Sequence, residues 1–500
     1  MIRGVILLLT ALASLAGEVG AQGFEPSACP FRVPPGQLEG QTVECGFLSV
    51  PENRTSPNGR SIRLAVAIFR DQSGTTQPDP IVYLNGGPGG SALMFIYLSF
   101  PSFYGPVLGS AHRDLIVFDQ RGVVLSQPDL NCTLTTGTLD DFMACQATLQ
   151  GVADLTAYNT VENAADVEDL RLALGYGQVN LWGTSYGTRL ALGVMRDFPQ
   201  GLRSVVLDSV YPPQVDLYLE GPANADRAFE ALFQACAQDP ECSVDYPNLR
   251  GVFYGLVDRL RTAPTTITLR DPFSGQTFPY TVDDAGMEGI LFNFLYSSEL
   301  LPYLPRLIFD ADQNRWSSIG NLLGSMFAQA SRSVSRGMQL SVLCNEEAVF
   351  GSAGQFEAAL AEYPQLEPLY RGSILGGFGY QVCEGWDSGQ AGPAENQAVA
   401  SAVPTFIMSG AFDPITPPHW AEQTQQTLSA ASRTLYPATG HGASATACGQ
   451  SMLVAFLEDP SQPPSTECVS WMSLRFVGPN DALPFSEDAV RAMSLPSPLR

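Results

Sequence analysis

Short apolar runs recur along the first 210 residues and are separated by segments with helical spacing. The runs occupy residues 62–69, 81–84, 115–118, 179–182 and 205–207. They are apolar throughout rather than alternating, which is typical of strands buried on both faces of a parallel sheet. Between two of them, apolar residues recur at spacings of three and four at Val161, Ala164, Val167, Leu170 and Leu174. Strand and amphipathic helix in alternation predict an α/β fold with a mostly parallel, doubly wound sheet.

The pattern changes after residue 210. Helical segments dominate at 226–236, 249–260, 287–295 and 319–330, with one hairpin signal at 266–270 and 277–282. Strand-like runs return at 404–409 and 434–436, whereas residues 22–60 are rich in Pro, Gly and polar residues and read as an extended lead-in. We therefore expect a first core part over 22–210, an inserted, mainly helical cap over 211–395 and a second core part over 396–500.

The amino-terminal residues have the order of a secretory signal. Arg3 precedes an apolar run over 5–16, and small residues follow up to Ala21. An uncleaved membrane anchor is the alternative, but the run is shorter than the roughly 20 residues that cross a bilayer. We expect residues 1–21 to be a signal peptide, with no stable membrane insertion after cleavage.

Ten cysteines fit an exported protein, and their even number suggests disulfides. They are Cys29, Cys45, Cys132, Cys145, Cys236, Cys242, Cys344, Cys383, Cys448 and Cys468. Pairing between sequence neighbours would give five short loops, although other connectivities remain open. A metal site is disfavoured because the chain has no Cys-x-x-Cys pair and contains only three histidines. The protein is therefore expected to be secreted or periplasmic, without a metal.

The charge balance narrows the range of partners. Lys and Arg number 26 against 50 Asp and Glu, for a net charge of −24, and no lysine occurs. Neither nucleic acid nor an anionic membrane surface is attracted to so acidic a protein. We expect no nucleic-acid partner.

One serine has the setting of a nucleophile. The pentapeptide Gly183-Thr184-Ser185-Tyr186-Gly187 follows the strand-like run at 179–182 and precedes a helix-compatible segment. A Gly-x-Ser-x-Gly pattern in that position places the serine on a strained strand-to-helix turn. Ser185 is therefore the candidate nucleophile.

The nucleophile needs a base and an orienting carboxylate. Of the three histidines, His441 follows the strand-like run at 434–436, whereas His112 and His419 read as surface or packing residues. Asp413 follows the run at 404–409. The order Ser185, Asp413, His441 is that of α/β-hydrolases and of no other serine-protease fold considered.

Backbone N–H groups must hold the oxyanion of the tetrahedral intermediate. One is expected from Tyr186, at the start of the helix after the nucleophile. The other is expected from the glycine-rich loop over 85–91, with Gly87 favoured and Gly86 as the alternative. A phosphate-binding loop is excluded because the Gly-x-x-x-x-Gly-Lys pattern is absent.

Together these motifs resemble the prolyl aminopeptidase and tripeptidyl aminopeptidase family of α/β-hydrolases. They are Asn85-Gly86-Gly87-Pro88-Gly89, Asp119-Gln120-Arg121-Gly122, the Ser185 pentapeptide, Asp413 and His441. The resemblance covers about residues 40–475 and is strongest to the secreted tripeptidyl-aminopeptidase-like branch. It implies a serine exopeptidase without cofactors that acts on peptides with free amino termini. The chain departs from the family at Asn85, where His is common, and at Val123-Val124-Leu125-Ser126.

An aminopeptidase must also recognise the substrate ammonium, for which a carboxylate is the natural partner. Glu346 and Glu347 lie beside Cys344, and the resemblance suggests that Glu346 meets the amine. The alternative is that both are solvated charges at the start of a helix.

Two other functions stay open at this level. A secreted carboxylesterase would have the same triad, and an extracellular binding protein could keep an inactive hydrolase fold.

Overall fold

The computed structural model describes residues 23–56, 59–132, 134 and 137–485. The expected signal peptide, residues 1–21, lies outside this part of the chain. Within the described residues, no helix is both long and apolar enough to cross a membrane.

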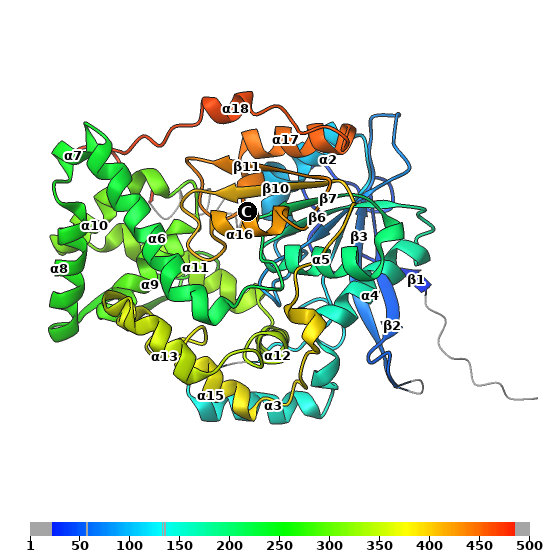
Figure 1. The fold of residues 1–500 in the computed structure, drawn as a ribbon, viewed down its shortest axis with the longest axis horizontal. Helices are drawn as coiled ribbons and strands as arrows, with labels where there is room; N and C mark the ends of the chain where they lie inside the picture. The colour runs from blue at the N-terminus through cyan, green and yellow to red at the C-terminus, as the bar shows by residue number, and fades with distance from the viewer. Residues whose placement is uncertain (1–22, 57–58, 133, 135–136, 486–500) are drawn as a thin grey trace, which may run out of the picture.

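A nine-stranded sheet forms the centre of the molecule, with strand order β1-β2-β3-β5-β4-β6-β7-β10-β11 (Figure 1). Its strands are β1 (Gly23–Pro26), β2 (Val43–Pro51), β3 (Ser61–Phe69), β4 (Ile81–Leu84), β5 (Leu115–Phe118), β6 (Val179–Thr184), β7 (Leu202–Asp208), β10 (Thr405–Gly410) and β11 (Ala431–Tyr436). From β5 to β11 every neighbouring pair is parallel, and only the β1, β2 and β3 side is antiparallel. The predicted mostly parallel sheet is confirmed.

Each predicted run became a strand, and the central ones are buried on both faces. All residues of β4 and β5 are buried. Successive side chains enter opposite layers, so that Val82 packs in one apolar cluster and Tyr83 in another. The lead-in over 22–60 was read as extended without a strand assignment, but it contains the nine-residue strand β2. Strand β2 pairs with β3 along its whole length, and this tertiary pairing could not be predicted from the composition of the segment.

Helices cover both faces of this sheet. The helices of the first core part are α1 (Ile96–Ser99), α2 (Gly105–Ala111), α3 (Leu139–Gln150), α4 (Thr160–Ala173) and α5 (Tyr186–Asp197). Those of the last part are α16 (Pro418–Gln425), α17 (Ala447–Glu458) and α18 (Glu467–Ser470). Apolar residues of α4 and α5 pack in one cluster and those of α2 and α17 in another. This three-layer arrangement is the predicted doubly wound fold.

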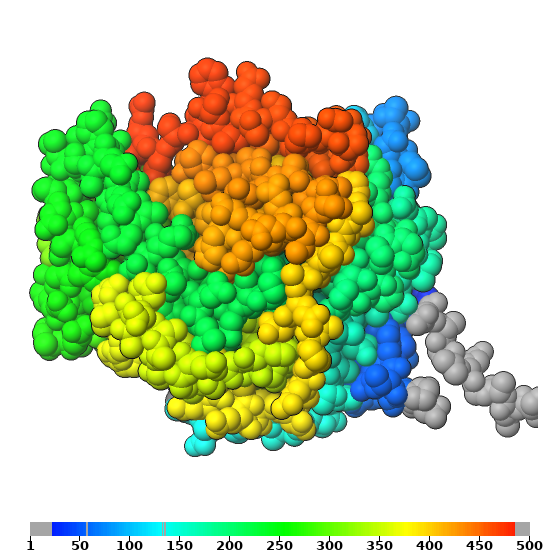
Figure 2. All heavy atoms as spheres, in the orientation of Figure 1, coloured from blue at the N-terminus to red at the C-terminus, as the bar shows by residue number. Residues whose placement is uncertain are grey.

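The segment between β7 and β10 is mainly helical and lies at one end of the sheet, in green to yellow (Figures 1 and 2). It contains α6 (Leu217–Gln238), α7 (Cys242–Asp245), α8 (Leu249–Thr262), α9 (Asp284–Leu295), α10 (Leu304–Asp312), α11 (Ser317–Ser333), α12 (Arg336–Glu346), α13 (Ala353–Ala361), α14 (Glu367–Tyr370) and α15 (Gly377–Gly385). The expected hairpin is β8 (Thr265–Arg270) with β9 (Thr277–Val282). Most of these helices share an apolar core of their own.

All ten cysteines are joined between sequence neighbours. The disulfides are Cys29–Cys45, Cys132–Cys145, Cys236–Cys242, Cys344–Cys383 and Cys448–Cys468. The predicted neighbour pairing is thus the one found in the structure.

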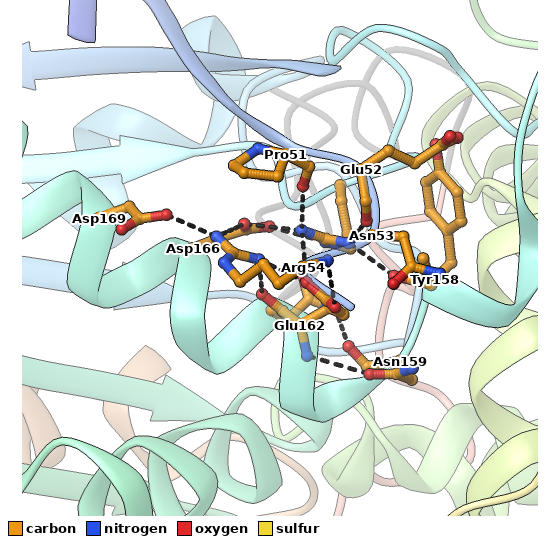
Figure 3. Close-up of polar contacts among 12 residues, drawn as sticks. Pro51, Glu52, Asn53, Arg54, Tyr158, Asn159, Glu162, Asp166 and Asp169 are labelled. Atoms are coloured by element: carbon orange, nitrogen blue, oxygen red, sulfur yellow. Dashed lines mark hydrogen bonds and ion pairs between the residues drawn. The ribbon is translucent and has the colours of Figure 1, made fainter. Parts of the chain in front are cut away.

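A buried ion cluster fixes α4 against the strands (Figure 3). Arg121, fully buried, donates to both oxygens of Asp166 at 2.7 and 2.8 Å and to the carbonyl oxygen of Glu52 at 2.6 Å. Arg54 donates to Asp166 at 2.7 Å and to Asp169 at 2.6 Å. Because Arg121 lies three residues after β5, the cluster joins the segment that follows β5 to α4.

Residues 471–485 leave α18 and cross to the helical segment (Figure 1). The N–H of Val477 donates to Pro302 O at 3.1 Å, and Tyr246 Oη donates to Val477 O at 2.7 Å. Phe476 and Phe485 are buried in the apolar core of the helical segment. This tail ties the end of the chain to that segment.

Candidate active site

Ser185 stands on the turn between β6 and α5 with backbone angles φ 58° and ψ −127°. A positive φ is disfavoured for residues that have a β-carbon, so the backbone of Ser185 is strained. The turn is tight because a Cβ on Gly187 would lie 1.9 Å from Leu84 O, and one on Gly183 would lie 2.5 Å from Gly187 O. The two glycines of the pentapeptide are therefore required by close backbone approach.

His441 and Asp413 meet at the carboxyl ends of β10 and β11. The distance from His441 Nδ1 to Asp413 Oδ2 is 2.8 Å. Asp413 is fully buried, whereas the side chain of His441 keeps 11% of its surface exposed. The His441 ring also lies against the Tyr296 ring, with centroids 4.9 Å apart, and the backbone N–H of His441 donates to Tyr296 O at 2.9 Å. The structure thus brings together the predicted base and its orienting carboxylate.

The His441 loop also lies beside the nucleophile turn. A Cβ on Gly442 would lie 4.0 Å from Thr184 Cγ2, next to Ser185. The loop is anchored on β7, because Asp208 accepts the N–H groups of Ala443 and Ser444 at 2.8 Å. The contacts of the described residues include no hydrogen bond from Ser185 Oγ to His441; such bonds are often long before substrate binds.

The charges of the pair support each other. Burial lowers the pKa of His441, but the ionised Asp413 outweighs burial and raises that pKa above its usual value. Burial raises the pKa of Asp413. The charge of His441 and the hydrogen bonds from His441 and Thr416 have a larger, opposite effect, so the pKa of Asp413 lies below its usual value. Asp413 therefore stays ionised and stabilises a protonated His441.

The glycine-rich loop after β4 touches the nucleophile. A Cβ on Gly86 would lie 2.8 Å from Ser185 Cβ and 3.3 Å from Ser185 Oγ. The Asn85 side chain closes the loop by donating to Gly90 O at 2.9 Å. Gly87 adopts φ 125°, a conformation that glycine tolerates. Asn85 therefore shapes the loop at the position where the family commonly has His.

Two neighbours fix this loop from outside. Asp119, fully buried, accepts hydrogen bonds from Ser91 Oγ and from the N–H groups of Ala92 and Leu93. Ser335, just before α12, donates its N–H to Gly89 O at 2.8 Å. Tyr186, whose N–H is the other expected oxyanion donor, is the first residue of α5. Both expected donor segments therefore border Ser185.

Glu346 and Glu347 lie at the end of α12, 1% and 3% exposed. Glu346 accepts from Thr160 Oγ1 at 2.6 Å and from Arg189 Nε at 3.2 Å. Glu347 lies 2.8 Å from Arg189 Nη1 and accepts the N–H of Leu217 at 3.0 Å. The alternative of solvated helix-start charges was wrong, because both carboxylates are buried and each forms an ion pair with Arg189 on α5.

The other two histidines lie elsewhere. His112 ends α2 in the left-handed conformation, and its carbonyl accepts the N–H of Gln77 at 2.8 Å. His419 lies on α16, 3.4 Å from Glu220, with 43% of its side chain exposed. Among the described residues no group of three or more His, Cys, Asp or Glu side chains has the arrangement of a metal site.

Sequence reasoning missed several residues that position the site. Thr416 Oγ1 donates to Asp413 Oδ2 at 2.6 Å and lies 3.1 Å from His441 Nδ1. Arg227 on α6 donates to the carbonyl oxygens of Ala411 and Asp413. Thr416 could have been found, because a Thr three residues after Asp commonly closes a local turn. Arg227 could not, because its contacts join segments far apart in sequence.

Two family models match separate parts of the chain. The alpha/beta hydrolase fold model matches residues 79–257, and the TAP-like protein model matches residues 377–468. The first contains the segment around Ser185, and the second contains Asp413 and His441.

Two curated relatives and one solved structure illustrate the similarity. Serine protease Hip1 of Mycobacterium tuberculosis is 24% identical over 451 residues, which are 83% of this chain and 84% of the relative. Tripeptidyl aminopeptidase of Streptomyces coelicolor is 31% identical over 250 residues, 44% of each chain. The crystal structure of proline iminopeptidase from Mycobacterium smegmatis is 14% identical, with a TM-score of 0.38 over 83% of this chain and 98% of that one.

Proposed function

We propose that the protein is a serine aminopeptidase acting outside the cytoplasm, because residues 79–257 match the alpha/beta hydrolase fold model and residues 377–468 match the TAP-like protein model. The observation that carries the proposal is the strained Ser185 turn, with Gly86 against the nucleophile and the Asp413–His441 pair at the neighbouring strand ends. Relatives named serine protease and tripeptidyl aminopeptidase support peptides as substrates.

In the proposed reaction Ser185 Oγ attacks the scissile carbonyl while His441 takes its proton. Asp413 holds the tautomer of His441 that has the proton on Nδ1 and stabilises its positive form. The N–H groups of Gly87 and Tyr186 donate hydrogen bonds to the carbonyl oxygen and stabilise the negative charge that develops on it. His441 then protonates the leaving amine, and water hydrolyses the acyl-enzyme by the reverse roles.

Recognition of the substrate ammonium is assigned to Glu346 and Glu347. Two carboxylates meet one guanidinium at Arg189, which leaves one negative charge uncompensated when both are ionised. Burial raises the pKa of Glu347 to about 7, with Arg189 opposing this effect. A bound ammonium would supply the missing positive charge and favour the ionised form.

The helical segment between β7 and β10 is proposed to be a cap, as the 211–395 boundaries suggest. It borders the site through Tyr296 and Ser335. Five disulfides support a location outside the cytoplasm, together with the expected signal peptide over residues 1–21.

Matched peptide anilides test the proposal. One set has a free amino terminus, one is acetylated, and a third replaces the scissile amide by an ester. Selective cleavage of the free set, lost in Ser185→Ala, is expected. Equal cleavage of free and acetylated peptides, or hydrolysis of esters alone, would instead indicate a secreted carboxylesterase.

The assignment of the ammonium site has its own test. Glu346→Gln and Glu347→Gln should raise KM for free peptides, with Glu422→Gln, an exposed residue of α16, as the control. Cleavage of an acetylated ester should keep its KM in all three variants. An equal change of KM for both substrates would show that the two carboxylates serve only the fold.

A further inference from the structure

The first turn of α12 packs directly on the glycine-rich loop. A Cβ on Gly89 would lie 2.5 Å from Ser335 O and 3.1 Å from Gln339 N. The same loop touches Ser185 through Gly86. Arg336, the first residue of α12, therefore belongs to the turn that packs on the loop bordering Ser185.

Arg336 is unusual in this chain because it has no acidic partner among the described residues. Eighteen other arginines form ion pairs with carboxylates. The guanidinium of Arg336 instead donates one hydrogen bond, to Gln339 Oε1 at 2.6 Å. An arginine without a carboxylate partner is notable in a protein with 50 acidic and 26 basic residues.

The Arg336 guanidinium is partly buried, but no neighbouring carboxylate among the described residues balances its charge. The side chain is only partly exposed, and burial lowers its pKa with no charged group opposing the effect. Asp129 accepts a hydrogen bond from Ser335 Oγ at 3.2 Å but forms no ion pair with Arg336. By contrast Arg227, which also lacks an ion pair, donates to two backbone carbonyls. A partly buried guanidinium without a counter-ion costs free energy unless a ligand supplies the charge.

We propose that Arg336 binds a carboxylate of the peptide substrate near the scissile bond. The proposal rests on the proposed function and adds a substrate class to it. A guanidinium fork matches a carboxylate with two parallel hydrogen bonds, and Gln339 holds one edge of the fork in place. The carboxylate can come from an Asp or Glu side chain next to the scissile bond or from the carboxyl terminus of a short substrate.

Two matched substrate pairs distinguish these sources. One pair differs by Glu against Gln next to the scissile bond, and the other by a free against an amidated carboxyl terminus. The full-length protein should prefer the acidic member of one pair by about tenfold in kcat/KM. Arg336→Met should abolish the preference through KM, and Arg336→Lys should restore part of it.

Arg332→Met is the matched control, because Arg332 is in the preceding helix and is paired with Asp271. It should leave the preference unchanged. The absence of any preference in the unmodified protein, or an unchanged preference in Arg336→Met, would overturn the proposal. If no peptide is cleaved, the same Glu and Gln pair made as esters tests Arg336 separately from the aminopeptidase activity.

Discussion

Four donors converge on the carboxylate of Asp413. They are the N–H groups of Ile415 and Thr416, the hydroxyl of Thr416 and Nδ1 of His441. This arrangement keeps a fully buried carboxylate ionised, which in turn raises the pKa of His441. The pH range of activity is therefore set at this residue.

The pH profile of kcat/KM should show this coupling. The base must be neutral, so activity should rise with pH through an apparent pKa above about 6.5, the ordinary value for histidine. In Asp413→Asn that apparent pKa should fall, because the negative charge is lost, and kcat should fall by about 10⁴. An apparent pKa that is unchanged in the variant would show that Asp413 does not face the base.

Thr416 should matter for catalysis although it does not touch substrate. Thr416→Val removes the hydroxyl that donates to Asp413 Oδ2, and we expect a loss of about tenfold in kcat/KM. Thr416→Ser keeps the hydroxyl and should retain most of the activity. Equal losses in the two variants would point to the packing of the methyl group instead.

Residues that belong to sequence motifs can be predicted from the sequence better than the residues that hold them in position. Ser185, Asp413 and His441 each follow a strand-like run, so topology alone predicts that they meet at one sheet edge. Arg189 and Asp208 carry no motif, and their partners are more than 150 residues away. Only the folded chain can show such contacts.

The elements of the core were predicted more closely than those of the helical segment. The runs at 81–84 and 115–118 coincide with β4 and β5, because a fully apolar run can only be placed in the sheet interior. Helix α6 begins at Leu217, nine residues before the predicted start at 226. Its first turns contain Pro222 and polar residues, whose helical state depends on tertiary packing.

Disulfides should contribute to stability according to the loops that they close. Cys344–Cys383 joins α12 to α15 across 39 residues, whereas Cys236–Cys242 spans 6. Replacing both cysteines of the longer loop by Ser should lower the free energy of unfolding by about 3–4 kcal/mol. The same change in the shorter loop should cost about 1.5 kcal/mol less, as urea unfolding can measure. A larger loss from the shorter loop would contradict the chain-entropy account.

Across the whole molecule, the tail over 471–485 joins the last core helix to the helical segment. Deleting residues 473–500 removes Phe476 and Phe485 from that segment's core. We expect a loss of about 3 kcal/mol or more in the free energy of unfolding, because two buried phenylalanines are lost. Deleting 486–500 alone keeps both and should have a much smaller effect. Equal stability of the two truncated proteins would show that the tail does not anchor the segment.

The most direct test of the central claim is covalent labelling of Ser185 by a peptide phosphonate, located by mass spectrometry. The account predicts one label per chain, on the peptide that contains Ser185, and no label in Ser185→Ala. Labelling should become slower in His441→Ala, because the hydroxyl then lacks its base. A label on another residue, or no label in a folded protein that binds the peptide, would contradict the assignment of Ser185 as the nucleophile.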